Sequence, residues 1–367
     1  MKKHVSIIIL NYNNAKVTKE CVNAILQNTK HQNVEILIVD NGSKKFERES
    51  LKMAFKNSDG FTIKFVQNYK NLGYGKANNR AVKKASGDIL VFLNNDVLVT
   101  RDWLTPLISF LQKNPTVAAC QPKIKSNMEK DFFDYAGGAG GFLDIFGYPF
   151  TRGRVFNSIE KDNGQYDKPC EIVWASGSCL IIKRELFQLV GGFDEYFFAY
   201  MEEVDLCVRL IQKKYKIYCV PKSVVFHYGA YTSNKKLTEK IFFNHKNNLY
   251  FVLKHYPLFP YLPLILIRIL FDVASLFYYV FETKPEFALS LLKTYRQMFL
   301  DLRFLFSKRI IRFFGDGLWN IDIIYKGSLV IDYFILKKRN FDAIFFKTRE
   351  STLRYYKNYL DITHFSE

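Results

Sequence analysis

Three short apolar runs, each followed at once by polar residues, restrict the fold of this 367-residue chain more than any other feature. The runs are "VSIIIL", "VEILIV" and "ILVFL", and the polar groups that follow them are "NYNN", "DNGS" and "NND". A strand that is apolar on both faces belongs in the middle of a mostly parallel sheet. The carboxyl ends of parallel strands meet at one edge, where open α/β sheets bind their ligands. The sequence therefore predicts an α/β fold with a ligand site at these three polar groups.

Helix-like segments separate the strand-like runs up to about residue 230, which indicates βαβ units and one α/β domain over residues 1–230. Strands are expected at 5–10, 34–40, 62–66, 89–93 and 117–120, and helices at 17–28, 76–85 and 102–112. The stretch 131–170 is rich in glycine and aromatic residues without a regular period, so we expect a long loop there. Residues 231–367 are predicted to form a second, helical region.

This C-terminal region is basic and aromatic. Residues 231–367 contain 21 Lys and Arg against 12 Asp and Glu, a balance of +9. The apolar stretch 256–281 approaches the length of a membrane span, but Arg268 and Asp272 interrupt it. We expect helices that lie on the inner membrane surface, with basic side chains at the headgroups and aromatic side chains in the interface. A helical subdomain or a homo-oligomer interface would produce the same pattern.

The charge of the whole chain points to a polyanionic partner. The 53 Lys and Arg exceed the 35 Asp and Glu by 18, which suits nucleic acid, a phosphorylated substrate or an anionic membrane. The basic residues are dispersed and no nucleic-acid-binding motif is recognised, so no nucleic-acid partner is expected. The six cysteines have no CxxC or metal-ligand spacing, and the apolar run Val5 to Leu10 is too short for a signal peptide. Both features favour the cytoplasm.

Three single residues have a functional and a structural interpretation. Asp40 could accept a hydrogen bond from the imide of a nucleobase, although "DNGS" is also an ordinary turn. Asp96 could bind Mg²⁺ or Mn²⁺ together with diphosphate oxygens, or it could end its strand and cap the next helix. His227 ends a strand-like run, where a lone histidine is more often a core residue than a metal ligand.

An acidic cluster begins a predicted helix in "YMEEVDLCVRL". The apolar spacing places Glu202, Glu203 and Asp205 in the first turn. The helix dipole stabilises negative charge there, and Asp205 can pair with Arg209 one turn later. A carboxylate in such a partly apolar setting is also a plausible general base.

Six motifs, taken together and in order, resemble the family 2 glycosyltransferases, especially their rhamnosyltransferase-like bacterial members. The motifs are "VSIIILNYNN", "ILIVDNGS", "NLGYGKANNRAV", "ILVFLNNDV", "WASGSCLIIKRELFQLVGGFDEYFFAYMEEVDLCVRL" and "VVFHYGAYTS", which extend over residues 4–233. The resemblance implies a GT-A nucleotide-diphospho-sugar transferase fold and transfer with inversion at the anomeric carbon.

The resemblance also implies which residues bind the donor. Asn11 and Asp40 would contact the nucleotide, Asn71, Gly73 and Asn78 would line the base and sugar-phosphate side, and Asn94 and Asn95 would lie beside them. Trp174 and Gly177 would line the donor and acceptor cleft. Lys76 would reach a donor phosphate or be a solvated lysine at a helix start.

For catalysis, the resemblance implies that Asp96 holds Mg²⁺ or Mn²⁺ against the diphosphate and that His227 completes this metal site. Glu203 would deprotonate the acceptor hydroxyl, with Glu202 and Asp205 as alternative bases. Glu203 stands where the family usually has Asp, one methylene shorter.

The expected function is a metal-dependent, inverting glycosyltransferase, peripheral on the inner face of the cell membrane. It would move rhamnose or another hexose from a dTDP- or UDP-sugar to a lipid-linked or polysaccharide acceptor in bacterial cell-surface glycan synthesis. The alternative is a non-catalytic GT-A-fold scaffold in a polysaccharide-assembly complex, which the glutamate at position 203 favours. A scaffold would not hydrolyse a donor.

Overall fold

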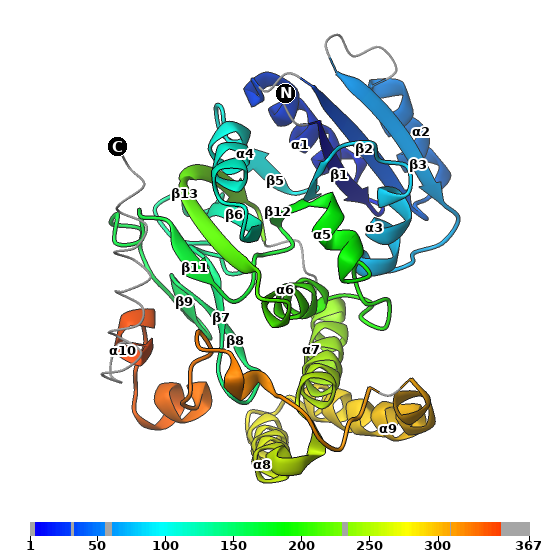
Figure 1. The fold of residues 1–367 in the computed structure, drawn as a ribbon. Coiled ribbons are helices and arrows are strands. Elements are labelled where there is room, and N and C mark those ends of the chain that lie inside the picture. The colour runs from blue at the N-terminus through cyan, green and yellow to red at the C-terminus, as the bar shows by residue number, and fades with distance from the viewer. Residues whose placement is uncertain (1–3, 31–32, 56–60, 230–233, 309, 346–367) are drawn as a thin grey trace.

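A nine-stranded sheet forms the centre of the computed structural model, which describes residues 4–30, 33–55, 61–229, 234–308 and 310–345. The strands lie in the order β11-β13-β6-β12-β4-β1-β2-β3, with β5 paired to β13 (Figure 1). They are β1 (Val5–Asn11), β2 (Val34–Asn41), β3 (Thr62–Asn68), β4 (Ile89–Asn94), β5 (Val97–Val99), β6 (Val117–Ser126), β11 (Cys170–Ile172), β12 (Cys179–Lys183) and β13 (Lys216–His227). All five predicted strands are present.

The four strands β3, β2, β1 and β4 run parallel, and this brings the polar groups together. Asn11 at the end of β1 is opposite Asp40 on β2, and Leu10 is opposite Asn94 on β4. The expected convergence of these strand ends at one edge is therefore confirmed. Beyond β4 the sheet is mixed, because β12 runs antiparallel to both β4 and β6.

Helices cover both faces of the sheet, as continuous apolar strands require. They are α1 (Ala15–Asn28), α2 (Lys45–Ala54), α3 (Tyr74–Val82), α4 (Leu104–Lys113), α5 (Arg184–Leu189) and α6 (Glu202–Gln212). Alternate residues of β1 point to opposite faces: Ile7 and Ile9 belong to the core with α1, α2 and α4, whereas Ile8 belongs to the core with α3, α5 and α6. The mixed α/β fold is thus confirmed.

The segment 131–170, predicted to be a long loop, instead contains a second sheet. Its antiparallel strands, in the order β10-β9-β8-β7, are β7 (Gly141–Leu143), β8 (Pro149–Thr151), β9 (Arg154–Val155) and β10 (Ser158–Ile159). Strands of two or three residues are too short to show a period, so the pattern was missed. Gly141 is required there, since a Cβ would lie 2.1 Å from the ring of Trp174.

Helices form most of the described C-terminal region, as predicted. They are α7 (Asn234–His255), α8 (Leu258–Phe281), α9 (Pro285–Ser307), a 3-10 turn (Leu318–Asn320), a π turn (Ile331–Ile335) and α10 (Phe341–Phe345), and residues 346–367 lie outside the described chain. Phe341 of α10 packs on Phe142 of β7, with ring centroids 4.8 Å apart. Because Phe251 of α7 shares a core with Phe142, the division into two domains at residue 230 stays a prediction.

Candidate active site

The predicted ligand edge contains a buried carboxylate, Asp40. Asn11 Nδ2 lies 3.4 Å from Asp40 Oδ1 and 3.1 Å from Ser43 Oγ, and Asn11 Oδ1 accepts from the Thr18 hydroxyl at 2.8 Å. Asp40 is 4% exposed, and its other carboxylate oxygen has no hydrogen-bond partner among the described residues. A buried acceptor without a partner is costly, so this oxygen suits a site that receives an N–H from a bound ligand.

Asn41, which the sequence analysis did not single out, organises the neighbouring loop. Its Nδ2 donates to Asn71 Oδ1 at 3.0 Å, and its Oδ1 accepts from Asn68 Nδ2 at 3.1 Å. Asn71 Oδ1 also accepts from the N–H of Gly73 at 2.9 Å. Gly73 has a φ of +76°, and a Cβ there would lie 2.3 Å from the carbonyl oxygen of Phe198. Only glycine allows this loop to approach the segment before α6 so closely.

The two polar residues of α3 differ in exposure. Asn78 is buried, donates to the Tyr74 carbonyl at 3.1 Å, and leaves its Oδ1 without a partner in the described chain. The Lys76 side chain is 52% exposed and pairs with Glu195 at 3.0 Å. The exposure of Lys76 and its ion pair are typical of a solvated lysine, and its contact with a donor phosphate stays a prediction. Asn78 lies at the edge with a free acceptor.

Asn94 and Asn95 connect the strand ends. The Asn94 N–H donates to the Ser178 carbonyl at 3.0 Å, which ties the end of β4 to the start of β12. Asn95 Nδ2 donates at 2.8 Å to the Thr18 hydroxyl, which in turn donates to Asn11. The structure thus assigns the Asn95 side chain to holding β1 and β4 in place.

Asp96 does not cap a helix, because β5 follows it directly. β5 pairs antiparallel with β13, and Val97 is opposite His227 in this pairing. The pairing brings Asp96 Oδ1 to 3.1 Å from His227 Nε2. The predicted metal pair, whose members are far apart in the sequence, is therefore brought together by two strands.

A second carboxylate, Asp134, holds the other side of the histidine ring. His227 Nδ1 lies 3.0 Å from Asp134 Oδ1, and Asp134 and His227 are both buried. Burial by itself would lower the pKa of His227, but the hydrogen bonds and charges of Asp134 and Asp96 outweigh it and raise the pKa to about 10. Asp134 was missed because it lies in the segment 131–170, which has no period from which to place it.

The acidic pair Glu202 and Glu203 begins α6, as predicted, after a strained turn. Tyr200 and Met201 both have positive φ, 70° and 74°. Asn247 of α7 holds this turn by donating to the Tyr200 carbonyl at 2.9 Å. Non-glycine residues in the left-handed region are uncommon and cluster at functional sites. The strained turn therefore marks the start of α6 as a place where side-chain position matters.

Both glutamates are poised to hold a proton. Burial and the neighbouring Glu203 raise the pKa of Glu202 well above its usual range, and burial also raises the pKa of Glu203. The Gly177 N–H donates to Glu203 and partly offsets this rise. One oxygen of each carboxylate has no partner among the described residues. Tyr74, which donates to the Gly177 carbonyl at 2.8 Å, closes this cluster from α3.

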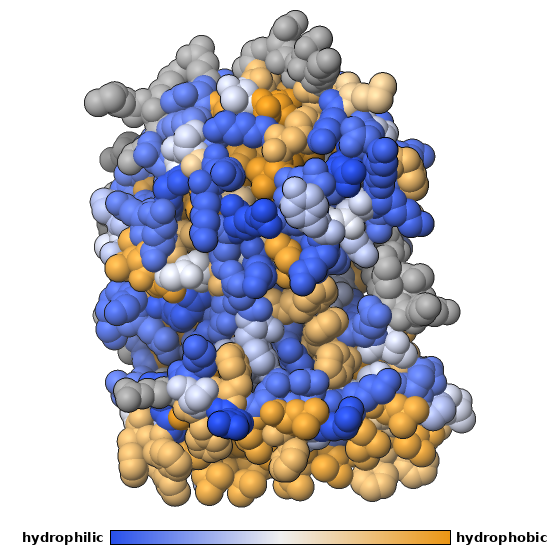
Figure 2. Space-filling view, turned by 90° about the vertical axis from the view of Figure 1, so that its right-hand side faces the viewer, coloured by the Kyte–Doolittle hydropathy of each residue, from blue (hydrophilic) through white to orange (hydrophobic). Residues whose placement is uncertain are grey.

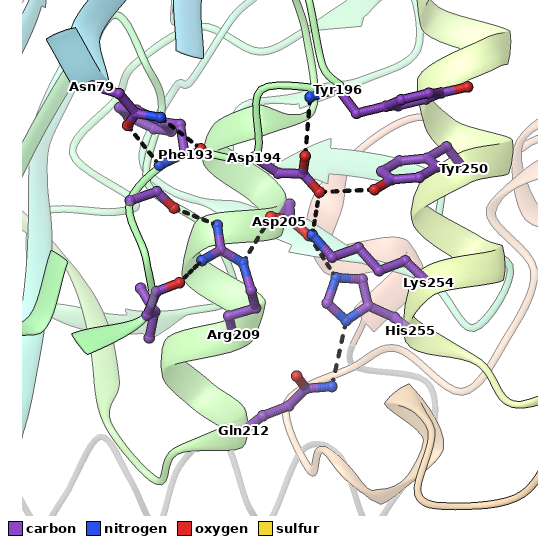
Figure 3. Close-up of polar contacts among 12 residues, drawn as sticks. Asn79, Phe193, Asp194, Tyr196, Asp205, Arg209, Gln212, Tyr250, Lys254 and His255 are labelled. Carbon is purple, nitrogen blue, oxygen red and sulfur yellow. Dashed lines mark hydrogen bonds and ion pairs between the residues drawn. The ribbon is translucent and has the colours of Figure 1, made fainter. Parts of the chain in front are cut away.

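Asp205 lies on the other side of α6 and is fully bonded. Figure 3 shows it between Arg209, Lys254 and His255, with distances of 2.8, 2.7 and 2.9 Å. Burial alone would raise the pKa of Asp205, but these partners, Arg209 foremost, hold it well below its usual range. The predicted Asp205–Arg209 pair is confirmed. Residues two apart on a helix point about 200° apart, so the structure does not bring Asp205 to the Glu203 cluster.

The first half of the chain matches a known family of enzymes. The model described as glycosyl transferase family 2 matches residues 6–191, from β1 to the end of α5. The chain belongs to this family. The resemblance noted from the six motifs is thereby confirmed.

Relatives of this glycosyltransferase include an O-antigen biosynthesis protein and a rhamnosyltransferase. The O-antigen biosynthesis protein RfbC of Myxococcus xanthus is 29% identical over 62% of this chain, which matches only 17% of that protein's length. The N-acetylglucosaminyl-diphospho-decaprenol L-rhamnosyltransferase of Mycobacterium tuberculosis is 26% identical over 60% of this chain and 74% of its own.

A solved structure shows the same fold over most of the chain. The mannosyltransferase PcManGT of Pyrobaculum calidifontis, in complex with GDP-Man and Mn²⁺, matches 84% of this chain and 82% of its own at a TM-score of 0.51. The sequence identity is 15%, so the likeness concerns the fold. The predicted GT-A fold is confirmed.

The two cleft residues of the glycosyltransferase prediction have different surroundings. Gly177 lies in the acidic cluster, where a Cβ would be 3.2 Å from the Tyr74 hydroxyl and 3.8 Å from Glu203 Cδ. Trp174 is buried, and its indole N–H donates to the Phe142 carbonyl at 2.8 Å. The ring of Trp174 therefore packs under the small sheet, whereas Gly177 borders the glutamates.

The potential metal ligands Asp96 and His227 suit a hard divalent cation whose other ligands are phosphate oxygens and water. Asp96 offers a carboxylate, and His227 offers an imidazole nitrogen that would bind the cation after losing its proton. Asp134 orients the ring as carboxylates do behind metal-bound histidines. Among the described residues, no group of three or more His, Cys, Asp or Glu is placed to hold a metal. Mg²⁺ and Mn²⁺ commonly take one or two protein ligands plus phosphate oxygens and water, so the residues fit such a cation.

A buried guanidinium, that of Arg154, lies near Asp134, the carboxylate that contacts His227. Arg154 stacks on Tyr135, with its central carbon 4.0 Å from the ring centroid, and Lys240 Nζ lies 4.9 Å from the same ring. Burial lowers the pKa of Arg154, and the charge of Asp134 acts in the opposite direction. Arg154 Nε has no hydrogen-bond partner in the described part of the chain. Arg154 therefore provides positive charge near Asp134, and Lys240 adds a second cation at Tyr135. Neither residue was among the predicted site residues.

Proposed function

We propose that this family 2 glycosyltransferase moves rhamnose or another hexose, with inversion, from a dTDP- or UDP-sugar to a lipid-linked or polysaccharide acceptor of the bacterial cell surface. The observation that carries the proposal is Glu203, a carboxylate of raised pKa with a free oxygen beside Gly177. A general base needs a free oxygen and a pKa closer to neutrality than that of an ordinary glutamate.

The nucleotide part of the donor would bind at the ends of β1 and β2. The free oxygen of Asp40 would accept the imide N–H that both uracil and thymine carry. The Asn41–Asn71 hydrogen bond fixes the loop through Gly73 on the side of α3. These contacts support a nucleobase with a ring N–H, as uracil and thymine have, and they do not specify the sugar of the donor.

Asp96 and His227 would hold Mg²⁺ or Mn²⁺ at the donor diphosphate. The cation, when bound, would stabilise the negative charge of the departing nucleoside diphosphate. The chain's own contribution is to fix the two ligands: the β5–β13 pairing sets their separation, and Asp134 keeps the imidazole ring oriented.

Glu203 would accept the proton of the acceptor hydroxyl as that oxygen attacks the anomeric carbon from the face opposite the leaving group. Direct displacement by one base gives inversion, because the sugar forms no covalent bond to the enzyme. Glu203 is partly exposed whereas Glu202 is 4% exposed, so the acceptor would reach Glu203 more readily. Glu202 is the more deeply buried of the two, and its raised pKa favours the protonated form.

A phosphate-bearing acceptor is supported by Arg154 and Lys240. Both cations lie over the ring of Tyr135, and Arg154 is close enough to Asp134 to interact with its charge. Arginine favours phosphate because its planar donors match the oxygens. The relative from Mycobacterium tuberculosis is named for a diphospho-lipid acceptor, which supports the same choice.

The test is a transferase assay with the purified full chain, Mn²⁺, a panel of dTDP-, UDP- and GDP-sugars, and a short-chain polyprenyl diphosphate sugar as acceptor. We expect one pyrimidine nucleotide-sugar to give a disaccharide whose anomeric configuration, measured by NMR, is opposite to that of the donor. Retained configuration would overturn the mechanism. Absence of both transfer and donor hydrolysis with every donor would favour the scaffold alternative.

A further inference from the structure

The lower end of the molecule carries an extended apolar surface. Figure 2 shows a continuous hydrophobic layer there, where Figure 1 places α8 and α9. We call this surface the apolar base. Its most prominent side chains are Leu266, Leu270, Phe277 and Phe281 of α8 and Phe299 and Phe306 of α9, which are exposed by 49 to 81%. Monomeric soluble proteins rarely expose contiguous apolar patches of such extent, so this one calls for a covering partner.

α8 is apolar on its outer side because its charges point inward. Arg268 and Asp272 are each 1% exposed, and they pair at 2.7 Å. Arg268 also donates to Asn248 of α7 at 3.1 Å, and Asp272 accepts from Tyr295 of α9 at 2.8 Å. The charges that interrupt the apolar sequence therefore fasten α8 to its neighbours, and they leave its other face apolar.

These buried contacts of Arg268 and Asp272 also limit how α8 can bind a lipid bilayer. The segment Tyr261–Phe281 is, by length and composition, the only helix in the described chain that could cross a membrane. To do so it would have to break the bonds of Arg268 and Asp272, and charged groups in the hydrocarbon core are costly. A helix that stays on α7 and α9 can offer a bilayer only its outer face, so it would lie along the interface.

α9 adds positive charge within the apolar base. Leu292, Arg296, Phe299, Arg303 and Phe306 follow one another at intervals of three or four residues, so they share one helix face, and all five are exposed. Arginines among large apolar side chains are typical of interfacial helices, since their stems lie along the lipid while the guanidinium reaches the headgroups. In a symmetric dimer the same arginines would be brought towards one another, which is unfavourable.

We propose that the apolar base docks this protein onto an anionic lipid bilayer, with α8 and α9 lying along the interface and not crossing it. The charge complementarity between Arg296, Arg303 and acidic headgroups identifies the occupant. The inference deepens the proposed function, and rests on it only in explaining why docking is useful: a lipid-linked acceptor is presented at that interface.

The first experiment is flotation of the purified full chain with vesicles of phosphatidylcholine alone or mixed with phosphatidylglycerol. We expect binding to the anionic vesicles and weaker binding to the neutral ones. The double variant Leu270→Glu/Phe277→Glu should bind at least about tenfold more weakly, because two large apolar side chains leave the interface. The matched control, Phe46→Glu on α2, changes an equally exposed aromatic residue outside the base and should bind like the parent.

A second pair of variants tests the charge. Arg296→Glu/Arg303→Glu should abolish the preference for phosphatidylglycerol. Lys83→Glu/Lys84→Glu, the same charge change at two exposed lysines directly after α3, should keep it. Circular dichroism checks that each variant is folded. No binding of the parent to either vesicle, or equal losses in variant and control, would overturn the proposal.

The alternative partner for the apolar base is a second copy of the chain. Mass photometry distinguishes a dimer from a monomer. A dimer that Leu270→Glu/Phe277→Glu converts to monomers, without vesicle binding by the parent, would contradict bilayer docking. Activity on a water-soluble acceptor should be unchanged in this variant. Vesicle binding without any transferase activity would contradict the proposed function but would still support the docking surface.

Discussion

His255 Nε2 lies 2.9 Å from Asp205 Oδ1, and this hydrogen bond joins α7 to the helix that carries the acidic pair. Lys254 reaches the same carboxylate oxygen at 2.7 Å, so two neighbouring residues of α7 bind one residue of α6 (Figure 3). Asn247, further up α7, holds the strained turn before Glu202. The C-terminal region therefore takes part in positioning the candidate base.

Replacing Asp205 by Asn should destabilise the fold. The variant leaves Arg209, Lys254 and His255 without their buried counter-charge, which typically costs about 3 to 5 kcal/mol. The free energy of unfolding, measured with urea at neutral pH, should fall by about that amount. The matched control Asp131→Asn removes an exposed carboxylate paired with Lys161 and should change it by less than about 0.5 kcal/mol.

The depressed pKa of Asp205 also predicts how the stability of the fold changes at acidic pH. Because its folded pKa is depressed, the stability it contributes is fully present above its unfolded pKa of about 3.9 and is lost as the pH falls further. The parent should therefore lose stability more steeply below about pH 4 than Asp205→Asn does. Parallel unfolding curves for the two proteins over this range would contradict the assignment.

Glu203→Gln should separate activity from stability. Loss of the general base should lower kcat by about 10²- to 10⁴-fold while the KM for the donor stays close to the parent value. Stability at neutral pH should rise, since a carboxyl group whose pKa is raised on folding is destabilising once the pH exceeds its unfolded pKa. The control Glu195→Gln alters an exposed glutamate that pairs with Lys76 and should leave kcat unchanged. Full turnover by Glu203→Gln would point to Glu202 as the base.

Asp96→Ala should abolish the dependence of nucleotide binding on Mn²⁺. In a thermal-shift titration, the parent should be stabilised more by dTDP with Mn²⁺ than by dTDP alone, because a ligand of the native state raises the midpoint. The variant should show the same small shift with and without the cation. Asp134→Asn, which acts through His227, should weaken the apparent Mn²⁺ affinity by about 10- to 100-fold without changing the shift with dTDP alone.

Asp40→Ala should weaken donor binding and spare the chemical step. Loss of a hydrogen bond to a charged acceptor costs about 1.5 to 3 kcal/mol, so the KM for the donor should rise about 10- to 100-fold. The kcat at saturating donor should remain within a few-fold of the parent, because Asp40 would touch only the nucleotide. A fall in kcat with unchanged KM would place Asp40 closer to the reaction than we infer.

Much of the candidate ligand edge could be predicted from local pattern. The apolar runs and their polar ends specify β1, β2 and β4, and parallel pairing then brings Asn11 next to Asp40. The first turn of α6 was equally predictable, since helical spacing places Glu202 and Glu203 there. In both cases the apolar residues recur with the period of a strand or a helix, two or 3.6 residues, within a few consecutive positions.

Local sequence pattern is thus enough to specify the central strands, their polar ends and the acidic helix start. The pairing of β5 with β13, which joins Asp96 to His227, the contact of Asp134 with His227, and the binding of Asp205 to α7 all depend on the packing of distant elements. It also decided that Arg268 and Asp272 turn inward and leave α8 apolar outside. The periodicity of a segment shows which of its side chains face the core. It does not show which distant element packs against that face, because this depends on how all the elements are buried together.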